Sequence, residues 1–433
     1  MKNIGCTAND GRIKVYAYGT DAFKSESLSV YFSVPAVKEK SVARALLLSV
    51  LKRGTQKYPT QRDINERLDE IYASLISFKN QKYDDVQLIG VSADVIDGIY
   101  TEGEGDLLRE ALEVVGEMLF HPRLDESHGG FCEEYVDSEK ENYKSIILSQ
   151  INEPRTYAAI RCREEMFSEL GNVDKLDTMC ERIDATGGDE LLSCYREMIC
   201  EAPITAFYVG TRDAEEVLAL VREILPSTDF SPLPASNKEI RRLTDRAEPA
   251  RFEEKSDVSQ ARLVIGYSCP VTWRDEDYYA MLLCNEILGA SPISKLMTVV
   301  REKLSLCYEC SSVYNSARGA LFVTTGIDRE NYELAERAIA EQIDLICEGQ
   351  ISETELNCAK KSIINVYSAV CDSPSAIERF YLGRLVNGID VDIPTFLENI
   401  EKLTASDVAA AAKKLKPHTV YFLSGDGGEA YCE

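Results

Sequence analysis

Few residues in this chain have types and spacing suited to acid–base or metal chemistry. The sequence contains three histidines, His121, His128 and His418. His121 and His128 would be about two turns apart on a helix, but Pro122 and the Gly129–Gly130 pair predict a loop. We therefore expect surface histidines there rather than a zinc ligand pair. His418 stands just before a predicted closing strand and is expected to be structural.

Cys307 and Cys310 form the single CxxC pair of the sequence. A zinc ribbon needs a second such pair, which this sequence lacks. The pair lies in a predicted strand, where residues three apart point to opposite faces and cannot easily share a metal. We therefore expect two buried or half-buried thiols rather than a metal or redox site. The sequence also lacks the GxSxG, GxxxxGK[ST] and GxGxxG motifs of common hydrolases and nucleotide-binding proteins.

Composition excludes several classes of function. The chain has 433 residues, with 73 acidic and 48 basic side chains and a formal net charge of −25. A surface with this much negative charge repels phosphate backbones and anionic lipids. We therefore expect neither nucleic acid nor a membrane as a partner. No segment is an evident membrane helix or signal core, and the 14 cysteines are scattered. A cytoplasmic protein with reduced, mostly buried cysteines is predicted.

The predicted secondary structure repeats once along the chain. A strand closed by proline occurs at residues 28–35 and again at 263–270, and an apolar helix follows each, at 43–51 and 278–288. A second helix and a strand hairpin come next in both halves. Further matching pairs are helix starts at Pro154 and Pro374, capping boxes at Thr186–Asp189 and Thr404–Asp407, and closing strands at 204–209 and 419–423. Their shared order indicates an internal duplication.

This duplication predicts an α+β fold of two homologous domains. Each domain is expected to contain a mainly antiparallel sheet with helices packed on one face. The predicted boundaries are residues 1–225 for the N-terminal domain and 261–433 for the C-terminal domain. Residues 226–260 contain four prolines among mixed charges and are predicted to be a linker.

The segments Leu51–Thr55 and Leu68–Ser74 resemble the N-terminal half of the pitrilysin/insulysin-type zinc peptidases, the inverzincins. Members of that family, which share a duplication with mitochondrial processing peptidase, carry an inverted zinc motif, HxxEH, on the first helix. Aligned on Gly54–Thr55, the five motif positions are occupied here by Ala45, Leu46, Leu47, Leu48 and Ser49. The two zinc ligands and the catalytic Glu are thus replaced by Ala45, Ser49 and Leu48.

A zinc-activated water needs about three protein ligands and a base that moves its proton. The degenerate motif supplies none of these, so we expect no metal bound by this chain and no zinc hydrolysis by the chain alone. The resemblance places the family's distal Glu ligand within residues 133–147. The candidates there are Glu133, Glu134, Glu139 and Glu141, which we interpret as a solvated helix face.

The C-terminal half carries a second family feature. Arg301 and Tyr308 match an Arg and a Tyr, seven residues apart, that in the family bind the substrate backbone near the scissile bond. A guanidinium and a phenol are suitable donors for a peptide carbonyl or a developing oxyanion. Without the resemblance, Arg301 would be interpreted as part of a solvated helix end and Tyr308 as a half-buried strand residue. With it, substrate binding by both residues is favoured.

A chain that lacks HxxEH but keeps the Arg/Tyr pair resembles the non-catalytic subunit of two-chain members of the family. The resemblance implies a heterodimer in which a homologous HxxEH partner supplies zinc and this chain binds peptide and completes the chamber. It extends to bacterial inactive pitrilysin-like proteins, some associated with modification of elongation factor P. The alternative is a non-proteolytic structural or peptide-binding scaffold, either a homodimer or a component of a larger assembly. An enzyme of another chemistry has no supporting motif.

Overall fold

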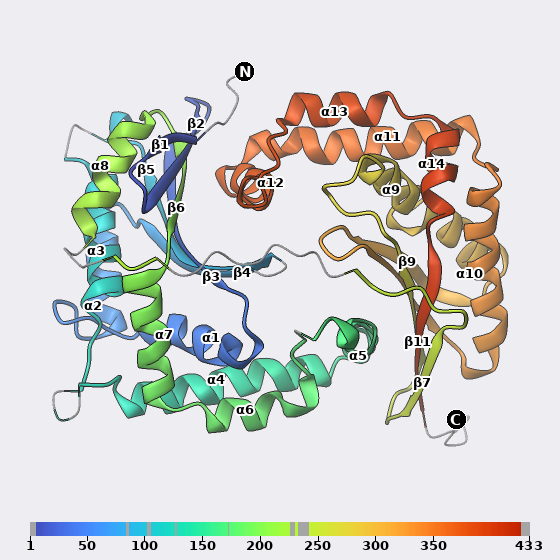
Figure 1. Ribbon diagram of the computed structural model, residues 1–433, viewed down its shortest axis with the longest axis horizontal. Helices are drawn as coiled ribbons and strands as arrows, with labels where there is room; N and C mark the ends of the chain where they lie inside the picture. Colours follow the sequence, from blue (N-terminus) through green and yellow to red (C-terminus); the bar gives the residue numbers. More distant parts are fainter. Residues whose placement is uncertain are drawn as a thin grey trace. The chain divides into compact units, whose positions relative to one another are not determined.

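The computed structural model describes residues 6–83, 86–101, 105–125, 127, 129–171, 173–225, 230–232 and 242–425 (Figure 1). The chain forms two compact units. Unit 1 comprises residues 1–146, 178–239 and 370–392, and unit 2 comprises residues 147–177, 240–369 and 393–433. Each unit contains one β-sheet, and both sheets combine with helices in the predicted α+β class.

The sheet of unit 1 has six strands in the order β1-β2-β6-β3-β5-β4. All neighbours are antiparallel except β2 and β6, which run parallel. The strands are β1 (Cys6–Asn9), β2 (Ile13–Gly19), β3 (Ser25–Pro35), β4 (Leu75–Tyr83), β5 (Val86–Ile96) and β6 (Ile204–Gly210). The helices of this unit are α1 (Ser41–Leu51), α2 (Gln61–Glu70), α3 (Leu107–Phe120), α6 (Met179–Ala185), α7 (Gly188–Glu201), α8 (Ala214–Ile224) and α12 (Pro374–Val386), while α4 (Glu133–Ile151) continues into unit 2.

The sheet of unit 2 has five strands in the order β7-β11-β8-β10-β9, and only β7 and β11 are parallel. The strands are β7 (Ala250–Lys255), β8 (Ala261–Ser268), β9 (Cys307–Asn315), β10 (Ala320–Ile327) and β11 (Lys416–Ser424). Its α-helices are α5 (Pro154–Phe167), α9 (Tyr278–Asn285), α10 (Tyr332–Cys347), α11 (Glu353–Ser368), α13 (Ile393–Glu401) and α14 (Ala405–Ala412). Two π-helical segments, η5 (Glu286–Ala290) and η6 (Leu296–Lys303), connect α9 to β9.

The strand order confirms the internal duplication. In unit 1 the order β2-β6-β3-β5-β4 has the same connectivity and directions as β7-β11-β8-β10-β9 in unit 2, and β1 is an additional edge strand. Pro154 and Pro374 begin α5 and α12, as predicted. The capping box at Thr404 is confirmed, but the one predicted at Thr186 is wrong, because α7 begins at Gly188 after an N-cap glycine.

The compact units are discontinuous along the chain, unlike the contiguous domains expected from the sequence. Each unit contains a helical segment from the opposite half of the sequence: α5 belongs to unit 2 and α12 to unit 1. The physical reason is the burial of apolar side chains. Cys162 and Met166 of α5 join the core formed by Val264 of β8 and Tyr421 of β11, and Leu382 of α12 packs with β3 and β5 residues of unit 1.

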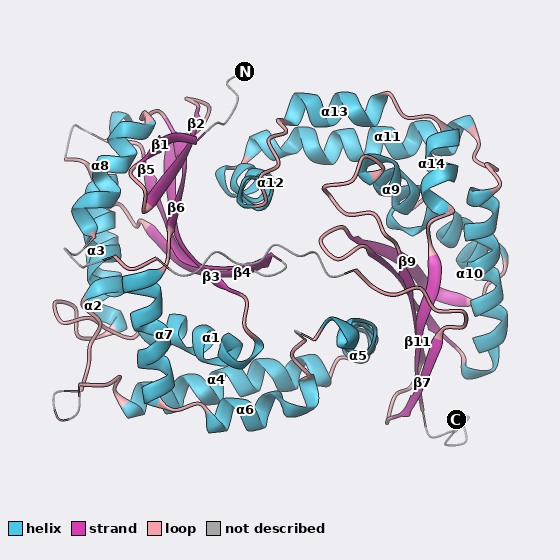
Figure 2. Ribbon diagram, viewed as in Figure 1, coloured by secondary structure: helices cyan, strands magenta, loops and turns pink. Residues whose placement is uncertain are grey.

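These helices add a layer to the predicted arrangement. Val264 faces α5, so the alternation of β8 points Leu263 and Ile265 to the other face, where both are also buried. Figure 2 shows α5 and α10 on opposite sides of this sheet. In unit 1 the Tyr31 hydroxyl of β3 donates a hydrogen bond of 2.7 Å to Glu378 on α12. Within the described residues, α5 packs against one face of the unit 2 sheet and α12 against one face of the unit 1 sheet.

The predicted linker, residues 226–260, is partly structured. Residues 226–229 and 233–241 lie outside the described part of the chain. Residues 250–255 form β7, which pairs with β11 from Ala250↔Thr419 to Lys255↔Ser424. The linker prediction is wrong for this segment, because the alternating side chains of β7 follow a strand period despite the nearby prolines and charges. Among the described helices, none combines the length and hydrophobicity needed to cross a membrane.

Candidate functional site

The positions that match the zinc motif lie on α1, within unit 1. Ala45 and Ser49 are half-buried one turn apart on the same helix face, and Leu48 is buried between the helix and its neighbours. The methyl group of Ala45 and the isobutyl group of Leu48 cannot bind a metal. Zinc sites in proteins use thiolate, imidazole or carboxylate ligands rather than a hydroxyl such as that of Ser49. The helix therefore keeps the expected position in the fold without the donor atoms.

A structural ion pair anchors α1. Arg44 is 1% exposed and donates hydrogen bonds of 2.6 Å to the Pro35 carbonyl and 2.8 Å to Gln87 Oε1. Its Nη2 also lies 3.2 Å from Glu197 of α7, a carboxylate that Lys40 approaches at 2.9 Å. Since a buried guanidinium is tolerated only when its charge and donors are satisfied, this network fixes α1 against β3, β5 and α7.

The chain makes a tight turn at Gly54–Thr55, directly after α1, and this turn requires a glycine. A Cβ at position 54 would lie 2.3 Å from the Pro59 carbonyl oxygen, so only glycine fits. Thr55 is fully buried, and its amide donates a hydrogen bond of 2.7 Å to the Tyr58 carbonyl. Its hydroxyl accepts a hydrogen bond of 2.8 Å from the Tyr58 amide. Local geometry thus explains this part of the resemblance without any catalytic role.

The candidate distal ligands on α4 differ in environment. Glu133, Glu134 and Glu141 are exposed, which confirms the predicted solvated face for these three. The prediction is wrong for Glu139, whose side chain is only 13% exposed because it forms an ion pair with Arg53. Arg53 also donates a hydrogen bond of 2.8 Å to Ser138. Within the described ranges, no group of three His, Cys, Asp or Glu side chains could hold a metal ion.

Two of the three histidines, His121 and His418, lie within the part of the chain that the structure describes. His121 is exposed at the end of α3, in the predicted loop, and His128 lies outside the described residues. His418 is fully buried, with Nδ1 2.8 Å from Thr419 Oγ1 and Nε2 3.8 Å from a Glu169 oxygen. Burial, aided by the charge of Arg246, lowers the pKa of His418 below its usual value. A neutral, structural His418 agrees with the prediction.

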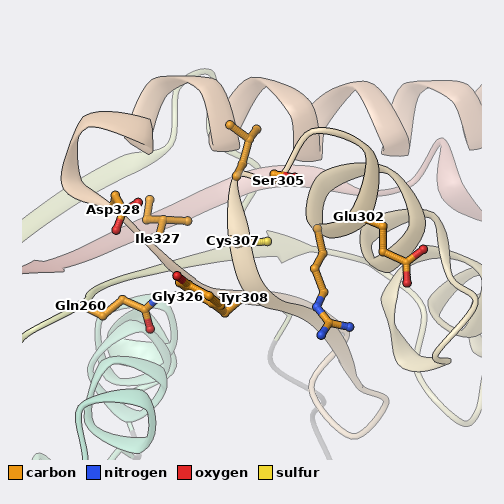
Figure 3. Close-up of a pocket in the computed structure, with 10 residues that line it drawn as sticks. Gln260, Glu302, Ser305, Cys307, Tyr308, Gly326, Ile327 and Asp328 are labelled. Carbon is orange, nitrogen blue, oxygen red and sulfur yellow. The ribbon is translucent and has the colours of Figure 1, made fainter.

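Arg301 and Tyr308 line one cavity in unit 2. Arg301 is exposed in the last turn of η6, and Tyr308 follows on β9 with a side chain that is 79% exposed. The cavity has a volume of about 420 Å³. Its other lining residues are Gln260, Glu302, Ser305, Leu306, Cys307, Gly326, Ile327 and Asp328 (Figure 3). The structure thus brings the two residues singled out from the sequence to the same site.

A β-bulge at Tyr308 explains its exposure. Cys307 pairs with Ile327 of β10 and Glu309 pairs with Gly326, so two neighbouring residues of β10 face three residues of β9. Tyr308 is the extra residue, and a bulge of this kind redirects its side chain. The alternative interpretation of Tyr308 as a half-buried strand residue is therefore wrong.

The same bulge corrects the interpretation of the CxxC pair. Cys307 pairs with Ile327 and Cys310 with Thr325, and because these partners are two residues apart on β10, both cysteines lie on one face of β9. Both are buried, as expected, and their thiols hydrogen-bond to each other. The sequence could not show this, because nothing in the residues 307–310 marks the extra residue.

The donors of Arg301 and Tyr308 are available for a ligand. Within the described part of the chain, neither side chain makes a hydrogen bond or an ion pair. The neighbouring carboxylate of Glu309 is already paired, at 2.7 Å from Arg262 and 2.7 Å from Arg155. The cavity therefore offers a guanidinium and a phenol whose donors are not taken up by the residues that the structure describes.

The neighbours of Cys307 change the acidity of its thiol. The hydrogen bond from the Cys310 thiol lowers the pKa of Cys307 to about 7, and Thr325 and the positive charge of Arg301 act in the same direction. Partial burial opposes this effect. Cys310 lies deeper, and the same hydrogen bond and its burial raise the pKa of Cys310. The two thiols thus differ in reactivity.

Comparisons with known proteins agree with the resemblance inferred from the sequence. Residues 188–363 match the family model for the Peptidase M16 inactive domain. A Bacillus subtilis (strain 168) protein, described as the probable inactive metalloprotease YmfF, is 28% identical over 418 residues, covering 96% of this chain and 97% of that protein. M16 is the pitrilysin-like family, so these matches confirm the predicted relationship to its inactive members.

Two solved structures share the fold over nearly the whole chain. A conserved protein from Enterococcus faecalis V583 is 25% identical with a TM-score of 0.87, covering 96% of this chain and 97% of that chain. The peptidase M16 inactive domain from Pseudomonas fluorescens is 17% identical with a TM-score of 0.80, covering 98% of both chains. The duplicated α+β fold is confirmed.

Proposed function

We propose that this chain, an inactive homologue of the M16 peptidases, is the non-catalytic subunit of a heterodimeric zinc metallopeptidase. In this proposal a homologous partner carrying HxxEH supplies zinc, its ligands and the general base. This chain binds the peptide substrate and completes the enclosed chamber. The observation that carries the proposal is the position of Arg301 and Tyr308, which line one cavity and whose side chains have no hydrogen-bond or ion-pair partner among the described residues.

The chemistry of the cavity suits a peptide backbone. The Arg301 guanidinium and the Tyr308 hydroxyl are donors that can bind peptide carbonyl oxygens or stabilise a developing oxyanion. They contribute binding energy and orientation to the reaction. The degenerate residues Ala45, Leu48 and Ser49 leave the chemical step to the partner, because they provide neither metal ligands nor a base.

The edge of the sheet supports an extended ligand. β9 is the last strand of the five-stranded sheet, and its outer side has no paired strand among the described residues. An extended peptide can add to such an edge through main-chain hydrogen bonds. The bulge at Tyr308 interrupts the regular ladder at one end of β9, so pairing would be confined to residues 309–315, with Tyr308 and Arg301 contacting the peptide beyond it.

Substitutions in the mixed complex test this function. In a complex of this chain with its HxxEH partner, Arg301→Ala should lower kcat/KM by about tenfold or more, since a hydrogen bond to a charged group contributes about 1.5–3 kcal/mol. Tyr308→Phe, which removes only a hydroxyl, should lower it by about 2- to 10-fold. The matched controls are Arg62→Ala and Tyr100→Phe, which change exposed residues of unit 1.

The two control variants remove the same kinds of group, a positive charge and a phenolic hydroxyl, away from the cavity. They therefore distinguish a loss of substrate binding from a general effect of removing such a group. They should leave kcat/KM within about twofold of the unmodified complex. Equal activity of the Arg301 and Tyr308 variants and the controls would contradict substrate binding. A chain that forms no active complex with any homologue would favour the non-proteolytic scaffold instead.

A further inference from the structure

We propose that Cys307 and Cys310 form a reversible oxidation site that reacts with hydroperoxides entering through the cavity beside Cys307. Cys307 is the attacking thiol, and Cys310 resolves the oxidised intermediate by forming a disulfide. The proposal concerns this chain alone and requires neither a peptide ligand nor a partner subunit.

The position of the pair on β9 permits this bond. The bulge places both cysteines on one face of β9, opposite Ile327 and Thr325. Same-face neighbours along a strand are about 6.6 Å apart between Cα atoms, which falls within the range of about 4.4–6.8 Å found for disulfides. The side-chain hydrogen bond between the thiols shows that the sulfur atoms already face each other. Without the bulge, the side chains would point to opposite faces and no bond could form.

The two thiols differ in how accessible they are to a hydroperoxide in the cavity, as expected for an attacking and a resolving cysteine. Cys307 lines the cavity with Ser305 and Tyr308 (Figure 3), whereas Cys310 is fully buried. A small hydroperoxide can therefore reach Cys307 first. The guanidinium of Arg301, at the same cavity, favours the thiolate form of Cys307. Cys310 is protected from direct attack and can react only with the sulfur atom beside it.

The reaction is balanced in two steps. The Cys307 thiolate attacks one oxygen of the hydroperoxide, the O–O bond breaks, and an alcohol or water leaves after taking up a proton, so Cys307 becomes a sulfenic acid. The Cys310 sulfur then attacks the Cys307 sulfur, and the sulfenic oxygen leaves as water with the Cys310 proton. Two thiols are oxidised by two electrons to a disulfide, and the hydroperoxide is reduced. An external dithiol reverses the change by exchange.

Other cysteines provide internal controls. Burial raises the pKa of Cys162 to about 12 and that of Cys269 to about 12, so both thiols should stay inert. Cys371 is exposed and free, and it reports on non-selective oxidation.

The test is site-resolved oxidation of the purified, fully reduced chain by a small excess of hydrogen peroxide at pH 7. After alkylation of the remaining thiols, mass spectrometry should find the peptide with Cys307 and Cys310 lighter by two hydrogens and without alkyl groups. Cys162 and Cys269 should be recovered alkylated. Dithiothreitol should restore both thiols of the pair.

Two near-isosteric variants assign the roles. Cys310→Ser should leave a sulfenic acid on Cys307 that a 1,3-dione reagent traps, and Cys307→Ser should leave the Cys310 thiol unmodified. Thermal melting of the reduced variants establishes that they fold. If the unmodified chain keeps both thiols while Cys371 is oxidised, or if Cys307 is overoxidised beside an intact Cys310 thiol, the proposal is overturned.

Discussion

Met166→Ala should destabilise unit 2, although Met166 comes from the N-terminal half of the sequence. Met166 lies on α5, is fully buried and packs against β8. Deleting a buried methionine side chain costs about 2–5 kcal/mol of unfolding free energy, because contacts are lost and a cavity remains. Met297→Ala, at a half-buried position of the same unit, is the control and should cost about 1 kcal/mol or less.

Gly266 on β8 supplies a second, coupled substitution. A Cβ placed on Gly266 would lie 2.6 Å from the Met166 sulfur. Gly266→Ala alone should therefore overpack the core and cost about 1–3 kcal/mol. In the double variant the new methyl group enters space that the methionine has vacated, so the combined loss should be smaller than the sum. The expected coupling is about 0.5–3 kcal/mol.

The single tryptophan makes this measurement specific to unit 2. Trp273 is the only tryptophan of the chain and lies in the 240–369 segment of unit 2. Urea unfolding followed by its fluorescence gives the midpoint and slope for each of the four chains of the cycle. Strictly additive losses, or a Met166→Ala transition that coincides with that of the unmodified chain, would refute the packing of α5 on β8.

Three further predictions concern single side chains. Arg44→Ala should lower the unfolding free energy by about 1–3 kcal/mol, because the Pro35 carbonyl and Gln87 lose a buried donor while Lys40 still pairs with Glu197. Equilibrium denaturation measures this, and an unchanged free energy of unfolding would contradict the anchoring role. Stability should fall as the pH drops below about 6.5, the unfolded pKa of histidine, because the lowered pKa of His418 means that the unfolded chain binds the proton first. His418→Gln should flatten that dependence, and an unchanged slope would exclude His418 as its source. The rate of alkylation of the Cys307 thiol should reach half its maximum near pH 7. Cys310→Ala should shift this midpoint to higher pH, because the hydrogen bond that lowers the pKa of Cys307 is lost. An unchanged midpoint would argue against that hydrogen bond.

Local sequence patterns were sufficient for the duplicated fold. Period-two runs and proline stops located β3 and β8, and the prolines at 154 and 374 marked the starts of α5 and α12. The association of α5 with unit 2 and of α12 with unit 1 could not be predicted, because an apolar helix face does not specify which sheet will cover it. The short alternation of β7 stands beside prolines and charged residues, and a local sequence pattern therefore does not distinguish it from a linker.

The candidate site shows the same division between local and tertiary information. The spacing of Arg301 and Tyr308 within a family pattern was enough to select them, and the structure places both at one cavity. The contact of the Cys307 and Cys310 thiols depends on the bulge at Tyr308, which is defined by pairing with β10. Pairing of this kind involves residues about twenty positions away, so no local pattern could reveal it.

Affinity purification of the tagged chain from cells of its own organism, followed by native mass spectrometry, tests the central claim most directly. The account predicts one copy of this chain with one copy of a homologue that carries HxxEH and zinc. Recovery of the chain alone, as a homodimer, or in an assembly without such a homologue would contradict its assignment as a metallopeptidase subunit.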